Sequence, residues 1–189
     1  LILLSTIASG QTKPVDDLYL DFTLFRSAQA TEKAIEVGEQ ILDHPDKLST
    51  RKQVNLYYHL AKQYEVDHQN DKAVVLYEKV VAAVPDYYVP HMALGYLYLK
   101  PANQLVSKIN ASKNNKVEYE KYVGQYQALL VKSIRHLEKA QACDPDEQLL
   151  TDIKDLYSRL RDKSGLATLD SRLKEYSKNC ITVLTDNEL

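Results

Sequence analysis

Histidine and cysteine are the residues of this sequence best suited to chemistry, because imidazole and thiol groups bind metals, transfer protons and act as nucleophiles. The sequence contains His44, His59, His68, His91, His136, Cys143 and Cys180. No two of these side chains stand at a spacing typical of metal ligands. The acidic pair Asp16–Asp17 falls at an expected helix start, where carboxylates favour the helix dipole. We therefore expect no catalytic residue, no metal site and no cofactor, and a protein that is not an enzyme.

Composition argues against two other classes of protein. The 24 Lys and Arg residues are balanced by 26 Asp and Glu residues, and the two signs are interleaved, so that the formal net charge is −2. Such a chain has no basic field to hold a phosphate backbone, and we expect no nucleic-acid partner. No apolar run is long enough to cross a bilayer, so we expect no stable membrane span.

Residues 1–13 resemble the end of a secretory signal peptide. The apolar run from Leu1 to Ala8 is followed by small residues and then by a polar segment. That order is typical of a hydrophobic region before a cleavage site with small residues. We expect residues 1–13 to be a signal-peptide remnant or a disordered N-terminus, and the chain to be secreted or periplasmic, in a bacterial envelope. The alternatives are a buried first helix and an ordinary apolar terminus.

Apolar residues recur at helical spacing through almost the whole chain, and Gly and Pro are scarce, with five and six residues. The pattern predicts helices over 16–27, 30–43, 50–66, 70–83, 87–99, 116–143, 146–161 and 165–178. A proline followed by Asp recurs at the connections around Pro45, Pro85 and Pro145. We expect Asp86 to cap the helix that follows it. Connectors that recur in this way indicate a repeated structural unit between them.

The segment 54–87 resembles a tetratricopeptide (TPR) repeat, a 34-residue helix–turn–helix unit. That repeat places large residues at positions 4, 7, 11 and 24, small residues at positions 8, 20 and 27, and proline at position 32. Counted from Val54, these positions hold Tyr57, Leu60, Tyr64, Tyr77, Ala61, Ala73, Val80 and Pro85. Small residues let the two helix axes approach each other, so Ala61 and Ala73 are expected at close helix contacts.

A second unit of this kind covers 88–147 and is interrupted. It places Gly95 at the small position 8, where another close contact is expected. Pro101 is expected to end its first helix, and the second helix follows an insertion. The resemblance implies an all-α fold over 14–180: a TPR-like α-solenoid of about four antiparallel helix pairs, with divergent flanking pairs. The insertion is expected to extend the helix hairpin of the third pair.

In TPR proteins, ligands usually lie on the concave face formed by the first helix of each pair. The resemblance places eight residues of this chain there: Asn55, Tyr58, His59, Lys62, Val89, Met92, Ala93 and Tyr96. The set departs from the carboxylate clamp of chaperone-binding TPR domains, which needs Lys and Asn where this chain has Tyr58 and Lys62. An aromatic and aliphatic surface better suits an extended peptide or a partner helix. Alternatively, the chain's own insertion or its other helices cover this surface.

Cys143 and Cys180 are either two buried free thiols or one disulfide. Parallel neighbouring helices have axes roughly 8–10 Å apart, whereas a disulfide needs Cα atoms within about 7 Å, so free thiols are the expected state. An oxidising compartment would favour the bridge. The strand-like residues Ile181–Leu184, in the C-terminal tail 181–189, stand alone without a predicted partner strand.

The resemblance implies a protein–protein interaction scaffold that binds a protein or peptide partner through its concave face. One alternative is a self-associating structural module, which would form a homo-oligomer. Another is an accessory domain of an envelope enzyme system. In each of these functions the chain acts by contact rather than by catalysis.

Overall fold

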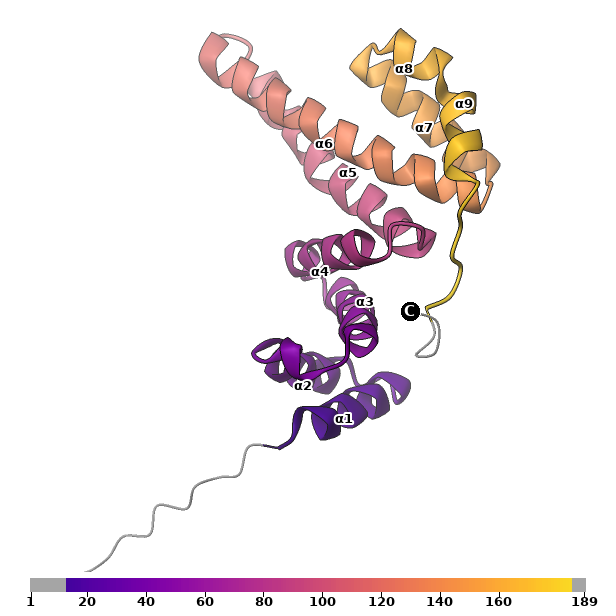
Figure 1. Ribbon diagram of the computed structural model, residues 1–189. Helices are drawn as coiled ribbons and strands as arrows, with labels where there is room; N and C mark the ends of the chain where they lie inside the picture. The colour runs from indigo at the N-terminus through magenta and orange to yellow at the C-terminus, as the bar shows by residue number, and fades with distance from the viewer. Residues whose placement is uncertain (1–12, 185–189) are drawn as a thin grey trace, which may run out of the picture.

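Residues 13–184 are almost entirely helical in the computed structural model, and this described part of the chain contains no strand (Figure 1). Its helices are α1 (Val15–Ser27), α2 (Thr31–Leu42), the 3-10 turn η1 (Pro45–Lys47), α3 (Thr50–Val66), α4 (Asn70–Ala83), α5 (Tyr88–Ala111), α6 (Lys116–Cys143), α7 (Glu147–Leu160), α8 (Lys163–Ala167) and α9 (Leu169–Tyr176). The predicted all-α class is therefore confirmed. The expected signal-peptide remnant lies outside the described residues, apart from Lys13.

Side-chain caps fix several helix starts close to their predicted positions. The Ser49 hydroxyl caps α3 and the Asp146 carboxylate caps α7, each by accepting a backbone N–H three residues later. Such caps satisfy backbone donors that a helix leaves unpaired at its start. The expected cap by Asp86 is wrong, because no side chain caps α5. Asp86 instead forms an ion pair with Lys139 of α6 at 2.8 Å.

Helix α5 differs most from the sequence prediction. Pro101 does not end it, and α5 continues through this residue to Ala111 while it packs against α6. A proline inside a helix costs about 3 kcal/mol, because it removes a backbone hydrogen bond. The packing on α6 offsets that cost, since Ala102 and Leu105 are buried in the turn after Pro101. The α5–α6 hairpin is thus formed by two long helices, of 24 residues in α5 and 28 in α6.

Helices that follow one another in the chain pack against one another, and α9 returns to pack on α6. Figure 1 shows them succeeding one another along an elongated molecule. Their buried side chains form two cores. The first core spans α1 to the first half of α5, and the second joins the rest of α5 to α6, α7 and the start of α9.

Three small residues lie at close helix contacts, as the repeat pattern predicts. Ala61 and Ala73 are fully buried. A Cβ atom built on Gly95 would overlap the Leu137 side chain of α6. A larger side chain at Gly95 would displace Leu137, and one at the fully buried Ala61 or Ala73 would have to displace core neighbours. Small residues here therefore allow the helices to pack closely.

One hydrogen bond recurs along the fold: a tyrosine of α3, α5 or α7 donates to a glutamate of the α-helix before it. These Tyr–Glu pairs are Tyr64–Glu39 at 2.9 Å, Tyr98–Glu78 at 2.6 Å and Tyr157–Glu138 at 2.6 Å. A cation lies over each tyrosine ring, where the negative face of the ring attracts it. The cations are Lys72, Lys132 and Arg172, at 5.1, 4.9 and 5.4 Å from the ring centroids. The α2–α3, α4–α5 and α6–α7 contacts are therefore built in the same way.

A disulfide joins Cys143, at the end of α6, to Cys180, with 5.5 Å between the two Cα atoms. The expectation of two buried free thiols is therefore wrong. It assumed that Cys180 lies on a helix parallel to α6, but α9 ends at Tyr176 and the chain beyond it brings Cys180 within bridging distance. The helix predicted over 165–178 is likewise divided, into α8 and α9.

Candidate functional site

The eight residues predicted to form a binding face divide between α3 and α5. Those on α3 are Asn55, Tyr58, His59 and Lys62, and those on α5 are Val89, Met92, Ala93 and Tyr96. We call this set the α3/α5 face. Its two halves meet where Tyr87, just before α5, packs its ring edge-on against Tyr58, with 5.1 Å between the ring centroids.

The α3 half is mostly covered by the chain itself. Asn55 and Tyr58 are only 4% and 8% exposed. Tyr58 is enclosed by rings of His59, Tyr77 and Tyr87. This corrects the expectation of an open aromatic surface on α3. The Tyr58 ring instead supports Lys62, whose ammonium lies 5.8 Å from the ring centroid and whose side chain is exposed.

The α5 half is more open. Val89, Met92 and Ala93 are half-buried, and Tyr96 is 44% exposed. The Tyr96 hydroxyl donates to the Asp152 carboxylate of α7 at 3.3 Å. Burial and the nearby negative charge of Asp152 raise the pKa of Tyr96, so its hydroxyl stays a neutral donor. This half therefore leaves a thioether, an aromatic ring and small apolar groups at least partly exposed.

Two further side-chain bonds join α5 to the region of α7. Tyr88 donates to Asp144 at 3.2 Å, and Arg159 donates to Asn103 at 3.5 Å. These bonds and the Tyr96 bond each join residues 56 positions apart in the sequence. Because the difference in residue number stays the same from one bond to the next, α5 and α7 run parallel. In an antiparallel pair this difference would change along the helices. The open side chains of α5 are therefore flanked by α7 along much of the helix.

A small hollow of about 290 Å³ opens beside the α3 half, at the end of α1. It is lined by Arg26, Ser27, His59, Lys62 and Gln63. Burial, with smaller contributions from the positive charges of Arg26 and Lys62, lowers the pKa of His59 to about 3, so this imidazole is neutral. The hollow offers two cations and no acid, which suits a carboxylate or another anionic group. Arg26 was not predicted as a site residue. The residues of α1 do not follow the repeat pattern closely enough to show which of them face α3.

A second polar cluster lies between α4, α5 and α6, and sequence spacing gave no sign of it. His91 Nε2 donates to the Pro85 carbonyl at 3.1 Å, which leaves His91 Nδ1 to accept from His136 Nδ1 at 3.0 Å. His136 Nε2 then carries no proton, and it faces Glu78 Oε1 at 3.5 Å. Burial lowers the pKa of His91 to about 4 and also lowers the pKa of His136.

These two histidines line a hollow of about 580 Å³, together with Lys132 and Arg135. A further hollow of about 640 Å³ shares Tyr98 with it and reaches the turn between α3 and α4. Both lie against α4 and the α5–α6 hairpin, whereas the α3/α5 face is formed by other residues. Two of these three hollows therefore lie against the hairpin, and neither is lined by a residue of the α3/α5 face.

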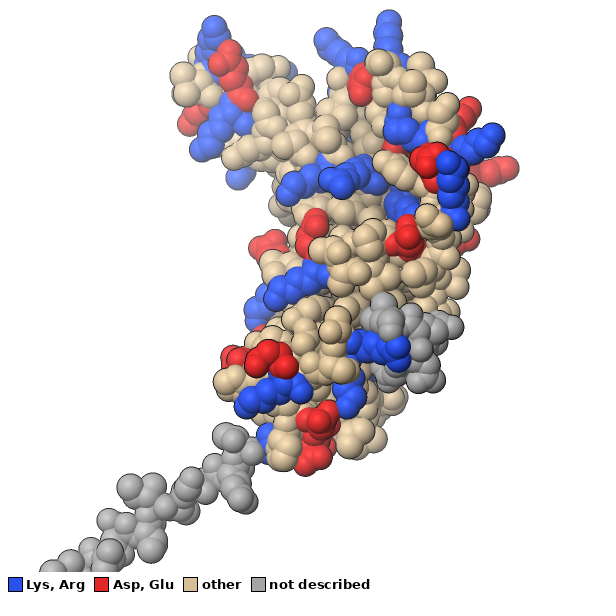
Figure 2. All heavy atoms as spheres, viewed as in Figure 1, with Lys and Arg blue, Asp and Glu red and all other residues tan. Residues whose placement is uncertain are grey.

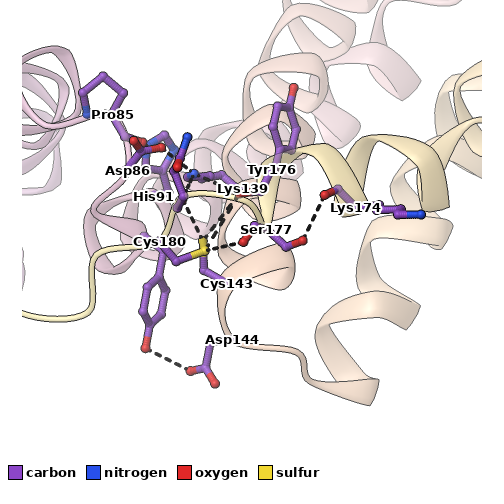
Figure 3. Close-up of a disulfide and its surroundings, with 12 residues drawn as sticks. Pro85, Asp86, His91, Lys139, Cys143, Asp144, Lys174, Tyr176, Ser177 and Cys180 are labelled. Carbon is purple, nitrogen blue, oxygen red and sulfur yellow. Dashed lines mark hydrogen bonds and ion pairs between the residues drawn. A yellow bond between two sulfur atoms is a disulfide. The ribbon is translucent and has the colours of Figure 1, made fainter.

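Lys139 of α6 holds the C-terminal segment against the turn between α4 and α5 (Figure 3). Its ammonium donates to the Asp86 carboxylate at 2.8 Å and to the carbonyls of Tyr176 and Asn179 at 3.1 and 2.6 Å. The Lys139 side chain is only 9% exposed. All three ammonium hydrogens therefore have acceptors, as a buried cation requires.

Beyond the disulfide, the chain is extended and returns to the first core. The Ile181 N–H donates to the Asp86 carbonyl at 2.7 Å, and the Tyr88 N–H donates to the Ile181 carbonyl at 3.3 Å. These bonds form a parallel bridge between Ile181 and Tyr87. Ile181 and Leu184 pack against the first core. The strand-like residues of the tail therefore do not stand alone, because they pair with the start of α5.

Within residues 13–184, no group of three or more His, Cys, Asp or Glu side chains is arranged to hold a metal ion. The same stretch has no helix with both the length and the apolar character needed to cross a membrane. Comparisons of the chain with protein-family models, with curated proteins and with solved structures find no match. The TPR resemblance therefore rests on the residue pattern.

Proposed function

We propose that this chain is a TPR-like α-solenoid that acts as a protein–protein interaction scaffold. In this proposal, the α3/α5 face binds an extended peptide segment of a partner protein. The recurring Tyr–Glu pairs and the close contacts at Ala61, Ala73 and Gly95 support a repeated helical architecture. Stacked helix pairs present their first helices side by side, which gives a long surface for a peptide.

The observation that carries the proposal is the combination of a partly exposed apolar stripe with an acid-free basic hollow. Tyr96 is exposed and Met92 is half-buried on α5, and Arg26 and Lys62 line the hollow beside α3. A peptide carboxylate would pair with the two cations, and apolar peptide side chains would contact the α5 stripe. Aromatic and cationic anchors of this kind contribute most of the binding energy in many interfaces.

The charge distribution supports a protein partner rather than a nucleic acid. Figure 2 shows Lys and Arg interspersed with Asp and Glu over the viewed face. A nucleic acid would need a continuous basic stripe along its backbone. A location in a secreted or periplasmic compartment is also part of the proposal. The Cys143–Cys180 disulfide supports it, since disulfides persist in oxidising compartments.

Panning a random-peptide display library against the purified chain tests the proposal. We expect enrichment of peptides that combine an acidic residue with apolar residues. Binding of synthetic copies, measured by fluorescence anisotropy, should weaken about tenfold in Lys62→Glu and in Tyr96→Ala, because each removes an anchor of the α3/α5 face.

Lys174→Glu is the matched control, since Lys174 is an exposed lysine on α9. It should bind the selected peptides as the wild type does. Peptides that ignore Lys62→Glu and Tyr96→Ala would exclude this face as their site, and a library without enrichment would contradict peptide binding. A homodimer in sedimentation that Tyr96→Ala dissociates would favour the self-associating alternative.

A further inference from the structure

The C-terminal tail is an extended segment packed on the first core, although it comes from the far end of the chain (Figure 1). Ile181 and Leu184 are half-buried there, whereas Val183 is 58% exposed. The tail therefore lies on the surface of the helical core and covers part of it. Its mode of attachment shows what kind of segment this surface accepts.

Two backbone hydrogen bonds hold the tail at the edge formed by Asp86, Tyr87 and Tyr88. We call these three residues the 86–88 edge. Backbone bonds of this type do not depend on the side chains of the bound strand, so any extended peptide can form them. The packing of Ile181 and Leu184 adds a preference for aliphatic side chains three positions apart.

The tail is anchored upstream of these contacts. Lys139 binds the Asn179 carbonyl at 2.6 Å, and Cys180 is covalently bound to Cys143 (Figure 3). The segment from Ile181 onward is therefore not needed to hold α9 or the disulfide in place. It can leave the 86–88 edge while the anchor stays closed.

The 86–88 edge adjoins the α3/α5 face. Tyr87 contributes its backbone to the bridge with Ile181 and its ring to the contact with Tyr58. Tyr58 in turn supports Lys62, at the rim of the basic hollow. A peptide that binds the face and continues past Tyr87 would meet the tail.

We propose that the 86–88 edge is a binding site for an extended aliphatic peptide, and that the tail occupies this site within the free chain. The inference rests on the proposed scaffold function, and it names the partner class. The partner segment pairs in parallel with Tyr87, as Ile181 does, and displaces residues 181–184. Because the tail is tethered, its effective concentration is on the order of millimolar, and a partner must compete with it.

The test uses the capped peptide Ac-Ile-Thr-Val-Leu-NH2 as a probe for the edge. In the full-length variant Ile181→Pro, the tail loses the N–H that donates to Asp86, so the edge is vacated more often. We expect the probe to bind this variant about tenfold more tightly than the wild type, measured by anisotropy of a labelled probe. A chain that ends at Cys180 should show at least the same gain.

Circular dichroism, thermal unfolding and thiol counting confirm that each variant is folded with its disulfide closed. The control probe Ac-Asp-Thr-Val-Asp-NH2 should not bind, because it lacks the aliphatic side chains. If the aliphatic probe binds neither folded variant, or binds them no better than the wild type, the inference is overturned.

The outcome is separable from that of the proposed function. Library peptides that are sensitive to Lys62→Glu, together with a failed probe, would leave the scaffold proposal standing and overturn only the tail site. A probe that binds Ile181→Pro, without any library peptide sensitive to Lys62→Glu, would support the 86–88 edge and overturn the proposed α3/α5 face.

Discussion

Glu78 and Glu138 occupy the same place in successive helix pairs, each seven residues before a connecting proline, Pro85 or Pro145. Each accepts a tyrosine hydroxyl at 2.6 Å. Their surroundings differ, because the Glu78 side chain is 43% exposed and the Glu138 side chain is 3% exposed. The same hydrogen bond is thus open in the middle of the molecule and sealed near its C-terminal end.

The partners of the two carboxylates explain the difference. Arg172 of α9 covers Glu138 and donates to both of its oxygens, at 2.9 and 2.7 Å. Glu78 instead faces the neutral ring of His136 across 3.5 Å, beside a hollow of about 580 Å³. The same hydrogen bond therefore does not contribute the same free energy at both places. Its contribution to the free energy of unfolding depends on whether a later helix buries it.

The largest effect is expected from Arg172→Met, which breaks the sealed pair. It leaves the Glu138 carboxylate buried without its cation, and loss of one partner of a buried ion pair typically costs 3–5 kcal/mol. The free energy of unfolding should fall by about that amount in urea titration. The matched change at the open pair, Lys132→Met, should cost less than about 1 kcal/mol, since Lys132 is exposed. Equal losses in the two variants would contradict the comparison.

Removing the disulfide tests how much the covalent link contributes to the stability of the sealed region. The bridge closes a sequence separation of 37 residues around α7, α8 and α9. In the chain-entropy model, Cys143→Ser with Cys180→Ser should lower the free energy of unfolding by about 3–4 kcal/mol. Thermal unfolding of the wild type with and without reductant provides the second measurement. A reduced wild type that melts as the oxidised one does would show that Lys139 alone holds the segment.

Acid should destabilise the open region. The pKa of His91 in the folded chain is about 4, below the ordinary value of about 6.5, because burial disfavours the charged ring. The folded state therefore binds fewer protons than the unfolded state, and stability is lost as the pH falls from about 6.5 toward 4. His91 alone should cost about 2 kcal/mol between pH 7 and pH 5, and the lowered pKa values of His136 and His59 add to the loss.

Urea titrations at pH 7, 6 and 5 measure this loss. His91→Gln should reduce the pH dependence, because it removes one titrating group and keeps a side-chain donor for the Pro85 carbonyl. His44→Gln replaces an exposed histidine and serves as the control. A wild type that is as stable at pH 5 as at pH 7 would contradict the buried neutral histidines.

The smallest effect is expected from Glu78→Gln. The amide oxygen can still accept the Tyr98 hydroxyl, and the site is open to water, so the loss should stay below about 1 kcal/mol. Glu138→Gln is the sealed counterpart and should cost at least about 2 kcal/mol, because Arg172 loses its charge partner. Denaturant titration of the two variants side by side gives the ratio of their losses in free energy of unfolding. A ratio near one would mean that burial does not distinguish the two pairs.

The sequence predicted the helices well, because their ends depend on local chemistry. Ser49 and Asp146 are caps, and the connecting prolines disfavour helix in the residue before them. The equivalence of Glu78 and Glu138 can also be read from the sequence, once Pro85 and Pro145 are aligned. Local rules were overruled at Pro101, where packing on α6 keeps α5 continuous.

The candidate site was harder to predict, since it depends on segments that meet only in the fold. Tyr58 was placed on an open face, but Tyr87 and Tyr77 cover it. Arg26 comes from a helix whose register the repeat pattern does not give. The pairing of Ile181 with Tyr87 depends on how α9 packs back across α6. The spacing of residues in the sequence does not predict that packing.

Helix α5 belongs to both cores, with Leu94 in the first and Ala102 in the second. Because backbone hydrogen bonds in a helix overlap from turn to turn, loss of order in one half of α5 weakens the turns of the other half. We therefore expect the two halves of the molecule to unfold in one transition rather than one after the other. We expect local opening to begin at α1, which packs chiefly on α2, and the amide hydrogens of α5 to be the last to exchange with solvent.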